Sequence, residues 1–330
     1  KKERTFLYVR MVLRPFRPIL AWIFNLLEEF LFRIPAYNAL CETYRPSAII
    51  LGTLSEPEDI VWLALARRRE IPAHAVDFPW SYLENRLWSV PRTANIHVWT
   101  EGMKNELMTL FPFSEKRVHV SGSQRYDWYK KKFPTISREE FFQRIGMDPK
   151  KRLMTYFAGT PYWNPYESGI AERILQKIAT GELPKDMQLM VRLGWKLSPS
   201  DDFVALTKKY PNFIVQSADE LPHQEYPSHL VYYSDVSLST FSSLALDAAA
   251  LDRPHIFTGL TGLSKPHPDE EGIAQIFEYE FMKSAVRAGG VRVAYDAKTF
   301  FSLLSGYLAD ASQDHEGRKK LVEEILGTID

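Results

Sequence analysis

Ser242, Ser243 and Asp247 have the types and spacing of a nucleotide-binding site. The residues around them predict a short strand, a polar turn, a helix of about ten residues and a further buried strand. The serines fall where the helix begins, so free backbone N–H groups and the positive end of the helix dipole favour phosphate there. Asp247 lies four residues after Ser243 on the same helix face, where its carboxylate could accept hydrogen bonds from a ribose. The alternative is that the serines only cap the helix and that Asp247 is solvated.

Two further candidates for phosphate contact follow predicted strands. Gly159 and Thr160 belong to a small loop directly after one strand, and the glycine allows the backbone to approach a ligand closely. Arg192 ends another strand, where a fixed cation could pair with a diphosphate; a surface salt bridge is the alternative. The sequence contains no P-loop and no G-x-G-x-x-G motif, which argues against a kinase or a dinucleotide-binding enzyme.

Asp77 and His74 are the candidate acid–base groups. His74 lies within a predicted strand and Asp77 follows its end, where a carboxylate facing a cleft could deprotonate an acceptor hydroxyl. His74 could act in the same way, or it could be a hydrogen-bonded core histidine. Glu84 and His267 are weaker candidates on loops. The sequence has no cluster with metal-ligand spacing and no G-x-S-x-G motif, so we expect neither a metal nor a serine nucleophile.

Strands and helices alternate along both halves of the chain, the pattern of an α/β fold with doubly wound parallel sheets. In the first half, apolar runs predict strands at 47–51, 71–76, 95–99 and 118–121, with helices at 58–69 and 102–110. In the second half they predict strands at 153–157, 188–192, 213–216, 230–233 and 255–258, with helices at 167–178, 201–209, 298–308 and 316–325. Such sheets bind ligands at the carboxyl ends of their strands.

The length of 330 residues suits two domains that each bury a core. The charged segment 131–150, with one helix starting near Ser137, is the expected connector. We therefore expect one α/β domain over 1–130 and a second over 151–330, facing each other across a cleft at the strand ends.

The composition excludes several classes of protein. Lys plus Arg equals Asp plus Glu, 41 against 41, so no net charge attracts nucleic acid. Cys41 is the only cysteine, which rules out an internal disulfide and fits a reducing, cytoplasmic setting.

Residues 1–35 are expected to be helical, because apolar side chains recur at steps of three and four residues. Basic residues flank this stripe, so the helix could lie on the inner face of a membrane, or it could pack on a sheet as an ordinary domain helix. The charge-free run between Arg17 and Glu28 is ten residues long, too short to span a membrane.

Three segments carry a resemblance to a known family. They are His97–Lys104 (HVWTEGMK), Arg117–Asp127 (RVHVSGSQRYD) and Ser242–Asp247, in this order. Together they resemble the GT-B glycosyltransferase superfamily, near bacterial surface-polysaccharide transferases, CDP-glycerol glycerophosphotransferases and UDP-GlcNAc 2-epimerases. The resemblance covers roughly residues 45–325.

The resemblance implies two Rossmann-like domains, an acceptor domain that is truncated here and a C-terminal domain that holds a nucleotide-activated donor. Ser242 and Ser243 would hold the donor phosphates, and Asp247 would take the ribose position, where relatives usually have Glu. Arg192 matches a basic residue that is commonly followed by His-Pro in the relatives. Gly194 and Trp195 stand in place of that His-Pro here. The stretch Trp80–Arg86 resembles a Ser-Trp-Asp-Asn-Leu…Lys motif of some relatives, with Ser81 in the place of its Asp. The usual acid is therefore missing or displaced, and Asp77 is the candidate base.

These observations predict a metal-independent glycosyltransferase that moves a sugar from a nucleotide diphosphate donor to a hydroxyl of a glycan or lipid-linked acceptor. The donor is a substrate, and no cofactor is expected. Two alternatives remain: transfer of a polyol phosphate from CDP-glycerol or CDP-ribitol, and a non-catalytic nucleotide-sugar binding domain. A 2-epimerase is less favoured, because its several acid–base groups find no match in the sequence.

Overall fold

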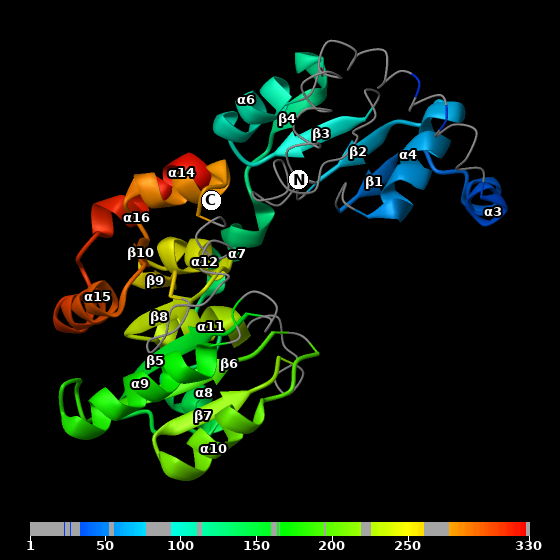
Figure 1. The fold of residues 1–330 in the computed structure, drawn as a ribbon. Helices are drawn as coiled ribbons and strands as arrows, with labels where there is room; N and C mark the ends of the chain where they lie inside the picture. The colour runs from blue at the N-terminus through cyan, green and yellow to red at the C-terminus, as the bar shows by residue number, and fades with distance from the viewer. Residues whose placement is uncertain are drawn as a thin grey trace, which may run out of the picture. The chain divides into compact units, whose positions relative to one another are not determined.

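The computed structural model forms two compact units, residues 1–123 and 124–330, each built on a parallel sheet (Figure 1). The structure describes residues 23, 27, 34–52, 56–76, 94–110, 114–159, 164, 166–194, 196–218, 226–260 and 277–327. The α/β class predicted from the alternation is confirmed.

Unit 1, residues 1–123, holds a four-stranded sheet in the order β1-β2-β3-β4. Its elements are α3 (Pro35–Tyr44), β1 (Ile49–Leu51), α4 (Pro57–Arg68), β2 (Ala73–Ala75), β3 (Asn95–Val98), α6 (Glu101–Leu110), the short 3₁₀ helix η2 (Glu115–Arg117) and β4 (Val118–Val120). Ile96 and Val98 point into the core and are fully buried, as the alternation of a strand requires. The predicted strands at 47–51, 71–76, 95–99 and 118–121 and the predicted helices at 58–69 and 102–110 are confirmed. Most of the predicted helix 1–35 lies outside the described residues.

Unit 2, residues 124–330, holds a six-stranded parallel sheet in the order β10-β9-β8-β5-β6-β7. Its strands are β5 (Arg152–Phe157), β6 (Met187–Arg192), β7 (Phe213–Gln216), β8 (Val236–Ser239), β9 (His255–Thr258) and β10 (Arg292–Ala294). Its helices are α7 (Gln124–Lys132), α8 (Arg138–Ile145), α9 (Glu167–Thr180), α10 (Asp201–Lys209), α11 (Tyr226–Tyr233), α12 (Leu244–Ala250), α14 (Glu280–Ala288), α15 (Ala297–Ala309) and α16 (His315–Leu321), which continues into a π-helical turn, η3 (Val322–Leu326).

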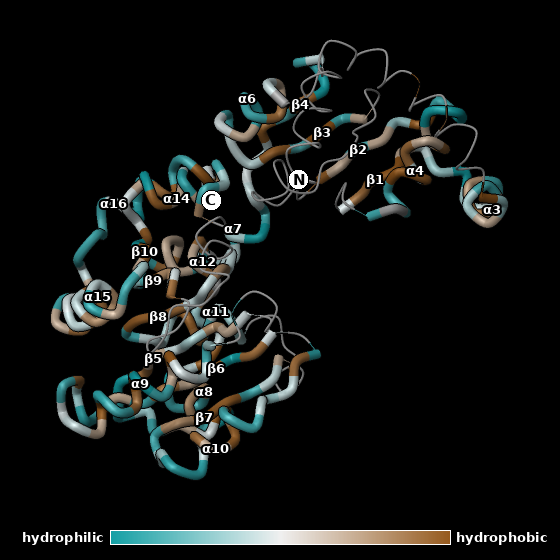
Figure 2. Tube along the Cα trace, viewed as in Figure 1, coloured by the Kyte–Doolittle hydropathy of each residue, from teal (hydrophilic) through white to brown (hydrophobic). Residues whose placement is uncertain are grey.

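Helices cover both faces of this sheet. Met154 and Tyr156 of β5 pack with α9, α10 and α15 in one apolar cluster. Leu153 and Phe157, which alternate with them, pack with α8, α11 and α12 in another. Burial on both faces explains why the central strands β5 and β6 are hydrophobic along most of their length (Figure 2). None of the described helices is long and apolar enough to cross a membrane.

The segment 131–150, expected as a connector, contributes to the core of unit 2. Ser137 caps α8 by accepting a hydrogen bond from Glu140 N at 3.2 Å. Phe141 and Phe142 of that helix are fully buried in the cluster with α11 and α12. The boundary between the two units falls after residue 123 of the chain, upstream of the expected connector.

The predicted strand 230–233 is wrong: these residues end helix α11. The short run Leu-Val-Tyr-Tyr suits either structure, and its neighbours decide the outcome. Leu230 and Val231 are fully buried against α8, α12 and the sheet, a packing that the helix provides. Of the described elements, α3, α7, α14, β10 and the short η2 were not predicted, and neither was α11 as a helix.

Candidate active site

The sheet order of unit 2 brings the predicted phosphate contacts to one edge. Strands β8, β5 and β6 are neighbours, with Phe157 paired in register to Arg192 on one side and to Ser239 on the other. The loops that follow these strands, starting at Ala158, Leu193 and Thr240, therefore leave the sheet side by side. This carboxyl edge is where parallel sheets bind ligands.

Arg192 lies half-buried at this edge, and one of its guanidinium nitrogens makes no hydrogen bond to the described residues. Its Nη1 is buried and has no hydrogen-bond partner among the described residues. Burial lowers the pKa of its guanidinium. Gln216, its register partner on β7, has a buried Oε1 that likewise finds no partner in the described part of the chain. Buried polar groups normally carry hydrogen bonds, so these two atoms at adjacent strand ends leave a donor and an acceptor that an ordered water or a polar ligand could satisfy.

Glu167, the first residue of α9, lies beneath the same loops and was not singled out from the sequence. Only 4% of it is exposed. Its carboxylate accepts hydrogen bonds from Gly159 N at 3.1 Å and from Thr240 Oγ1 at 2.8 Å, joining the loops after β5 and β8. Burial raises its pKa to about 7, although these hydrogen bonds oppose the shift.

Asn164 and Thr258 extend this buried network to the loop after β9. Asn164 Nδ2 donates to Thr240 Oγ1 and to Leu260 O, each at 3.1 Å. The hydroxyl of Thr258 lies 3.2 Å from that of Thr240 and 3.3 Å from that of Tyr156. Three loops at the carboxyl edge are thereby tied together, which holds the backbone around Gly159 in one arrangement. Thr160 lies outside the described residues.

Ser242 and Ser243 stand at the start of α12, as predicted, but the helix has seven residues instead of about ten. Ser242 Oγ accepts a hydrogen bond from Leu244 N at 3.2 Å and so serves the helix itself. Ser243 occupies the N-cap position, and its side chain makes no capping hydrogen bond. The Ser243 hydroxyl is therefore the one of the pair not engaged by the helix.

Asp247 is fully buried, so it is not the solvated side chain of the alternative reading. It accepts a hydrogen bond from the hydroxyl of Tyr129 on α7, and its Oδ2 lies 3.5 Å from Arg125 Nη2. Burial raises the pKa of Asp247, while Arg125 and Tyr129 oppose the shift. In this structure the carboxylate joins α7 to α12, and its role toward a ribose stays a prediction.

His74 belongs to a row of histidines on one face of the unit 1 sheet. Its Nδ1 lies 3.0 Å from Nε2 of His97 on β3, and the ring of His97 stacks on that of His119 on β4, with centroids 5.1 Å apart. Burial, and then the two neighbouring histidines, lower the pKa of His97. His74 is thus hydrogen-bonded and partly buried, and a role as base stays a prediction. Asp77 lies outside the described residues. Within those residues no three His, Cys, Asp or Glu side chains, the three histidines included, are arranged so that they could hold a metal ion.

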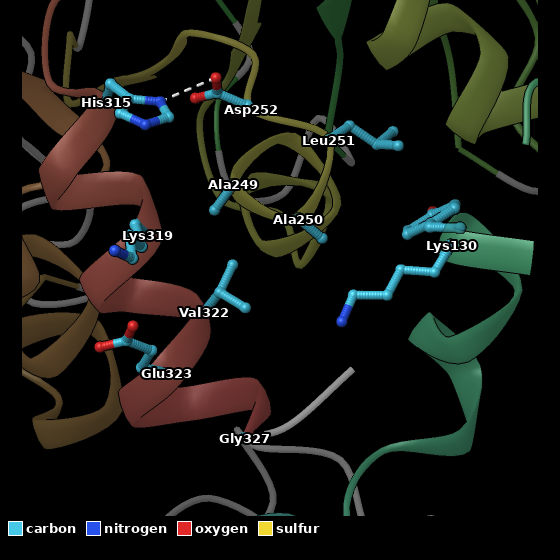
Figure 3. A pocket seen from close by; sticks show the side chains of 11 residues that line it. Lys130, Ala249, Ala250, Leu251, Asp252, His315, Lys319, Val322, Glu323 and Gly327 are labelled. Carbon is cyan, nitrogen blue, oxygen red and sulfur yellow. Dashed lines mark hydrogen bonds and ion pairs between the residues drawn. The ribbon is translucent and has the colours of Figure 1, made fainter. Parts of the chain in front are cut away.

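A cavity of about 650 Å³ lies at the other end of α12, away from its serines. The last residues of α12 line it together with α7, α16 and η3, and the side chains of Lys130 and Val322 extend into it (Figure 3). His315 Nδ1 lies 2.8 Å from Asp252 Oδ2 at its rim. None of the predicted site residues lines this cavity.

No protein-family model and no curated protein sequence matches this chain. Solved structures do match. The complex of Staphylococcus aureus MnaA with UDP superimposes with a TM-score of 0.59 at 12% identity, covering 92% of this chain and 77% of that one. The chain has the GT-B fold.

Two further structures support that assignment. The UDP-GlcNAc 2-epimerase of Neisseria meningitidis bound to UDP-GlcNAc matches with a TM-score of 0.56 at 15% identity, over 89% of this chain and 80% of that one. The Methanocaldococcus jannaschii UDP-GlcNAc 2-epimerase with UDP-GlcNAc and UDP matches with a TM-score of 0.51 at 11% identity, over 86% and 77%. The predicted resemblance to GT-B proteins is confirmed at the level of the fold.

Proposed function

We propose that this chain is a glycosyltransferase that takes a sugar from a nucleotide diphosphate donor, with the donor held at the carboxyl edge of the unit 2 sheet. The observation that carries the proposal is Arg192, whose buried Nη1 lacks a partner in the described residues beside the loop of Gly159. A diphosphate would supply the missing acceptors, and a fixed guanidinium would stabilise the charge that develops on the departing diphosphate.

The nucleotide in the proposal is a uridine diphosphate. Two GT-B structures similar to this chain contain UDP, and two contain UDP-GlcNAc. Gly159 N–H is occupied by Glu167, so the groups proposed to contact the diphosphate are Arg192, the hydroxyl of Ser243 and the backbone of the loop before α12. Asp77 or His74 is proposed as the base that activates an acceptor hydroxyl of a glycan or lipid-linked molecule.

A thermal-shift series with UDP, CDP, GDP, TDP and CMP tests the binding step. A ligand that binds only the folded chain stabilises it by about 2.7 kcal/mol at a hundredfold excess over its Kd. We expect UDP to give the largest shift. A response confined to CDP and CMP would favour the CDP-polyol alternative, and no response to any of them would contradict the proposal.

Turnover separates a transferase from a binding domain. We expect UDP to be released from a UDP-sugar faster in the presence of an acceptor glycan than in its absence. Conversion of UDP-GlcNAc to its 2-epimer would instead identify a 2-epimerase. Tight UDP-sugar binding with neither reaction, across a panel of acceptors, would identify the non-catalytic alternative.

A further inference from the structure

A second cavity of unit 2 lies at the opposite edge of the same sheet, where β5 and β8 begin. Its volume is about 460 Å³, room for on the order of ten water molecules. Of the charged residues that line it, five are basic and one is acidic: Arg138, Lys150, Lys151, Arg152, Arg253 and Asp235. In a chain whose charges balance overall, this is a strong local excess of positive charge.

Arg138 makes one wall of this cavity rigid. Its Nε donates to Pro149 O at 2.9 Å, its Nη1 to Tyr233 O at 3.1 Å and its Nη2 to Lys151 O at 2.8 Å. The guanidinium thereby ties the loop that carries the lysines to the end of α11. Burial lowers the pKa of Arg138; Asp235 is the largest influence that opposes the shift, and Arg253 adds a smaller one in the direction of burial.

Arg253 and the two lysines lack compensating partners. Arg253 lies with its Cζ 4.9 Å from the ring centroid of Tyr232, and its buried Nε has no hydrogen-bond partner in the part of the chain that the structure describes. Lys150 and Lys151 are exposed, and neither forms an ion pair with a described residue. Asp235, the one acid in the cavity, accepts a hydrogen bond from the backbone of β5 at 2.9 Å.

The remaining charges do not cancel this excess. Arg152 lies 3.9 Å from Asp186, a surface pair, and its Nη1 donates to Leu308 O at 3.2 Å. With Arg152 set against Asp186, and Arg138 against Asp235 and Glu139, three cations are left without an ion pair among the described residues: Arg253, Lys150 and Lys151. Three cations held around one cavity repel one another unless an anion joins them.

We propose that this cavity is a binding site for a phosphate-bearing ligand, contacted by Arg253, Lys150 and Lys151. A phosphate group carries up to two negative charges and several acceptor oxygens, which matches one guanidinium and two ammonium groups better than a carboxylate does. The aromatic face of Tyr232 holds the Arg253 guanidinium in place. The site is separate from the carboxyl edge of the sheet, called the nucleotide edge from here on because the proposed function places the donor there, and it does not depend on that proposal.

Calorimetric titration of the full chain with inorganic pyrophosphate tests the proposal. Because the nucleotide edge could also bind this probe, the titration is repeated in Arg192→Gln, where one saturable site is expected to remain. Combining Arg192→Gln with Lys150→Gln and Lys151→Gln is expected to weaken that site about tenfold. Lys208→Gln with Lys298→Gln removes the same charge from exposed positions elsewhere and is expected to leave it unchanged.

Vesicles distinguish a free ligand from a lipid headgroup. Co-sedimentation with phosphatidylcholine–phosphatidylglycerol vesicles, but not with phosphatidylcholine alone, and its loss in Lys150→Gln/Lys151→Gln would assign the site to anionic headgroups. Pyrophosphate binding without vesicle binding would assign it to a soluble phosphate compound. If the double lysine variant changes neither measurement, or if neither probe binds, the proposal is overturned.

Discussion

Two arginines of unit 2 are withdrawn from water, Arg192 at the end of β6 and Arg318 on α16, and their surroundings differ. Arg318 is 1% exposed, and each of its nitrogens has an acceptor: Nε donates to Asp252 Oδ1 at 2.7 Å, Nη1 to Gln313 O at 2.6 Å and Nη2 to Ala311 O at 2.9 Å. Arg192 Nη1, in contrast, has no partner among the described residues.

Under the proposed function, this difference separates a structural arginine, Arg318, from a ligand-binding one, Arg192. Burying a guanidinium costs free energy that only hydrogen bonds or an opposite charge offset. At Arg318 the protein supplies those acceptors itself, and the result is a contact between α16 and the turn after α12. At Arg192 the described residues supply no acceptor for Nη1, so the free energy of burying this group is not offset. The proposed function assigns the missing acceptors to the diphosphate of a bound nucleotide.

The largest expected effect is on stability at Arg318. Arg318→Met should lower the free energy of unfolding by about 3 kcal/mol, because two carbonyls and Asp252 lose their donor. Arg287→Met, on the exposed face of α14, is the matched control and should change it by less than about 1 kcal/mol. Urea unfolding of both variants measures this. An equal loss of unfolding free energy in the two variants would contradict the structural role given to Arg318.

The next effect is the pH dependence that Glu167 imposes. Burial raises its pKa from the ordinary value of 4.5 to about 7, so between these pH values the folded chain holds a proton that the unfolded chain has released. Stability from this group is therefore present below pH 4.5 and is lost as the pH rises to about 7, by about 3 kcal/mol in all. Glu167→Gln should remove that part of the slope.

Urea unfolding from pH 5 to 8 measures this effect as the difference between wild type and Glu167→Gln. Glu172→Gln, exposed on the same helix, controls for the loss of one negative charge. His255 opposes the slope in both proteins: burial lowers its pKa to about 3, so it reduces stability as the pH falls below its ordinary value of 6.5. If the unfolding free energies of wild type and Glu167→Gln change in parallel with pH, the Glu167 carboxyl group does not have the raised pKa that burial gives it here.

The smallest expected effect distinguishes the two serines of the nucleotide edge. Ser243→Ala should leave stability within about 0.5 kcal/mol, because its hydroxyl caps nothing, and should weaken nucleotide binding several-fold. Ser242→Ala should lower stability by about 1 kcal/mol through the lost hydrogen bond from Leu244 N. Thermal unfolding with and without UDP measures both. A loss of stability in Ser243→Ala together with a loss of UDP binding in Ser242→Ala would contradict this division of roles.

The sequence was sufficient to predict the edge where these residues lie, because strand ends and small polar loops are local signals. In this way Arg192, Gly159 and the serines were placed beyond the ends of their strands, while their contact with phosphate stays a prediction. The mistaken strand at 230–233 arose because a four-residue apolar run has no period long enough to separate helix from strand.

The buried contacts were not predictable, because they join residues far apart in the sequence. Glu167 meets Thr240 across 73 residues, and Tyr129 meets Asp247 across 118. Neither pair shows in any local pattern, so Glu167 was passed over and Asp247 was expected to face a ligand or solvent. Long-range packing decides which carboxylates are buried, and with them which pKa values shift.

Calorimetric titration of UDP into wild type and Arg192→Gln, with the free energy of unfolding of both, tests the central claim most directly. We expect saturable UDP binding to wild type and binding at least about tenfold weaker in Arg192→Gln. We also expect the unfolding free energy of the variant to be equal to or above that of wild type, because a desolvated charge is removed. Unchanged affinity, or a loss of stability like that of Arg318→Met, would contradict the claim and make Arg192 a structural residue.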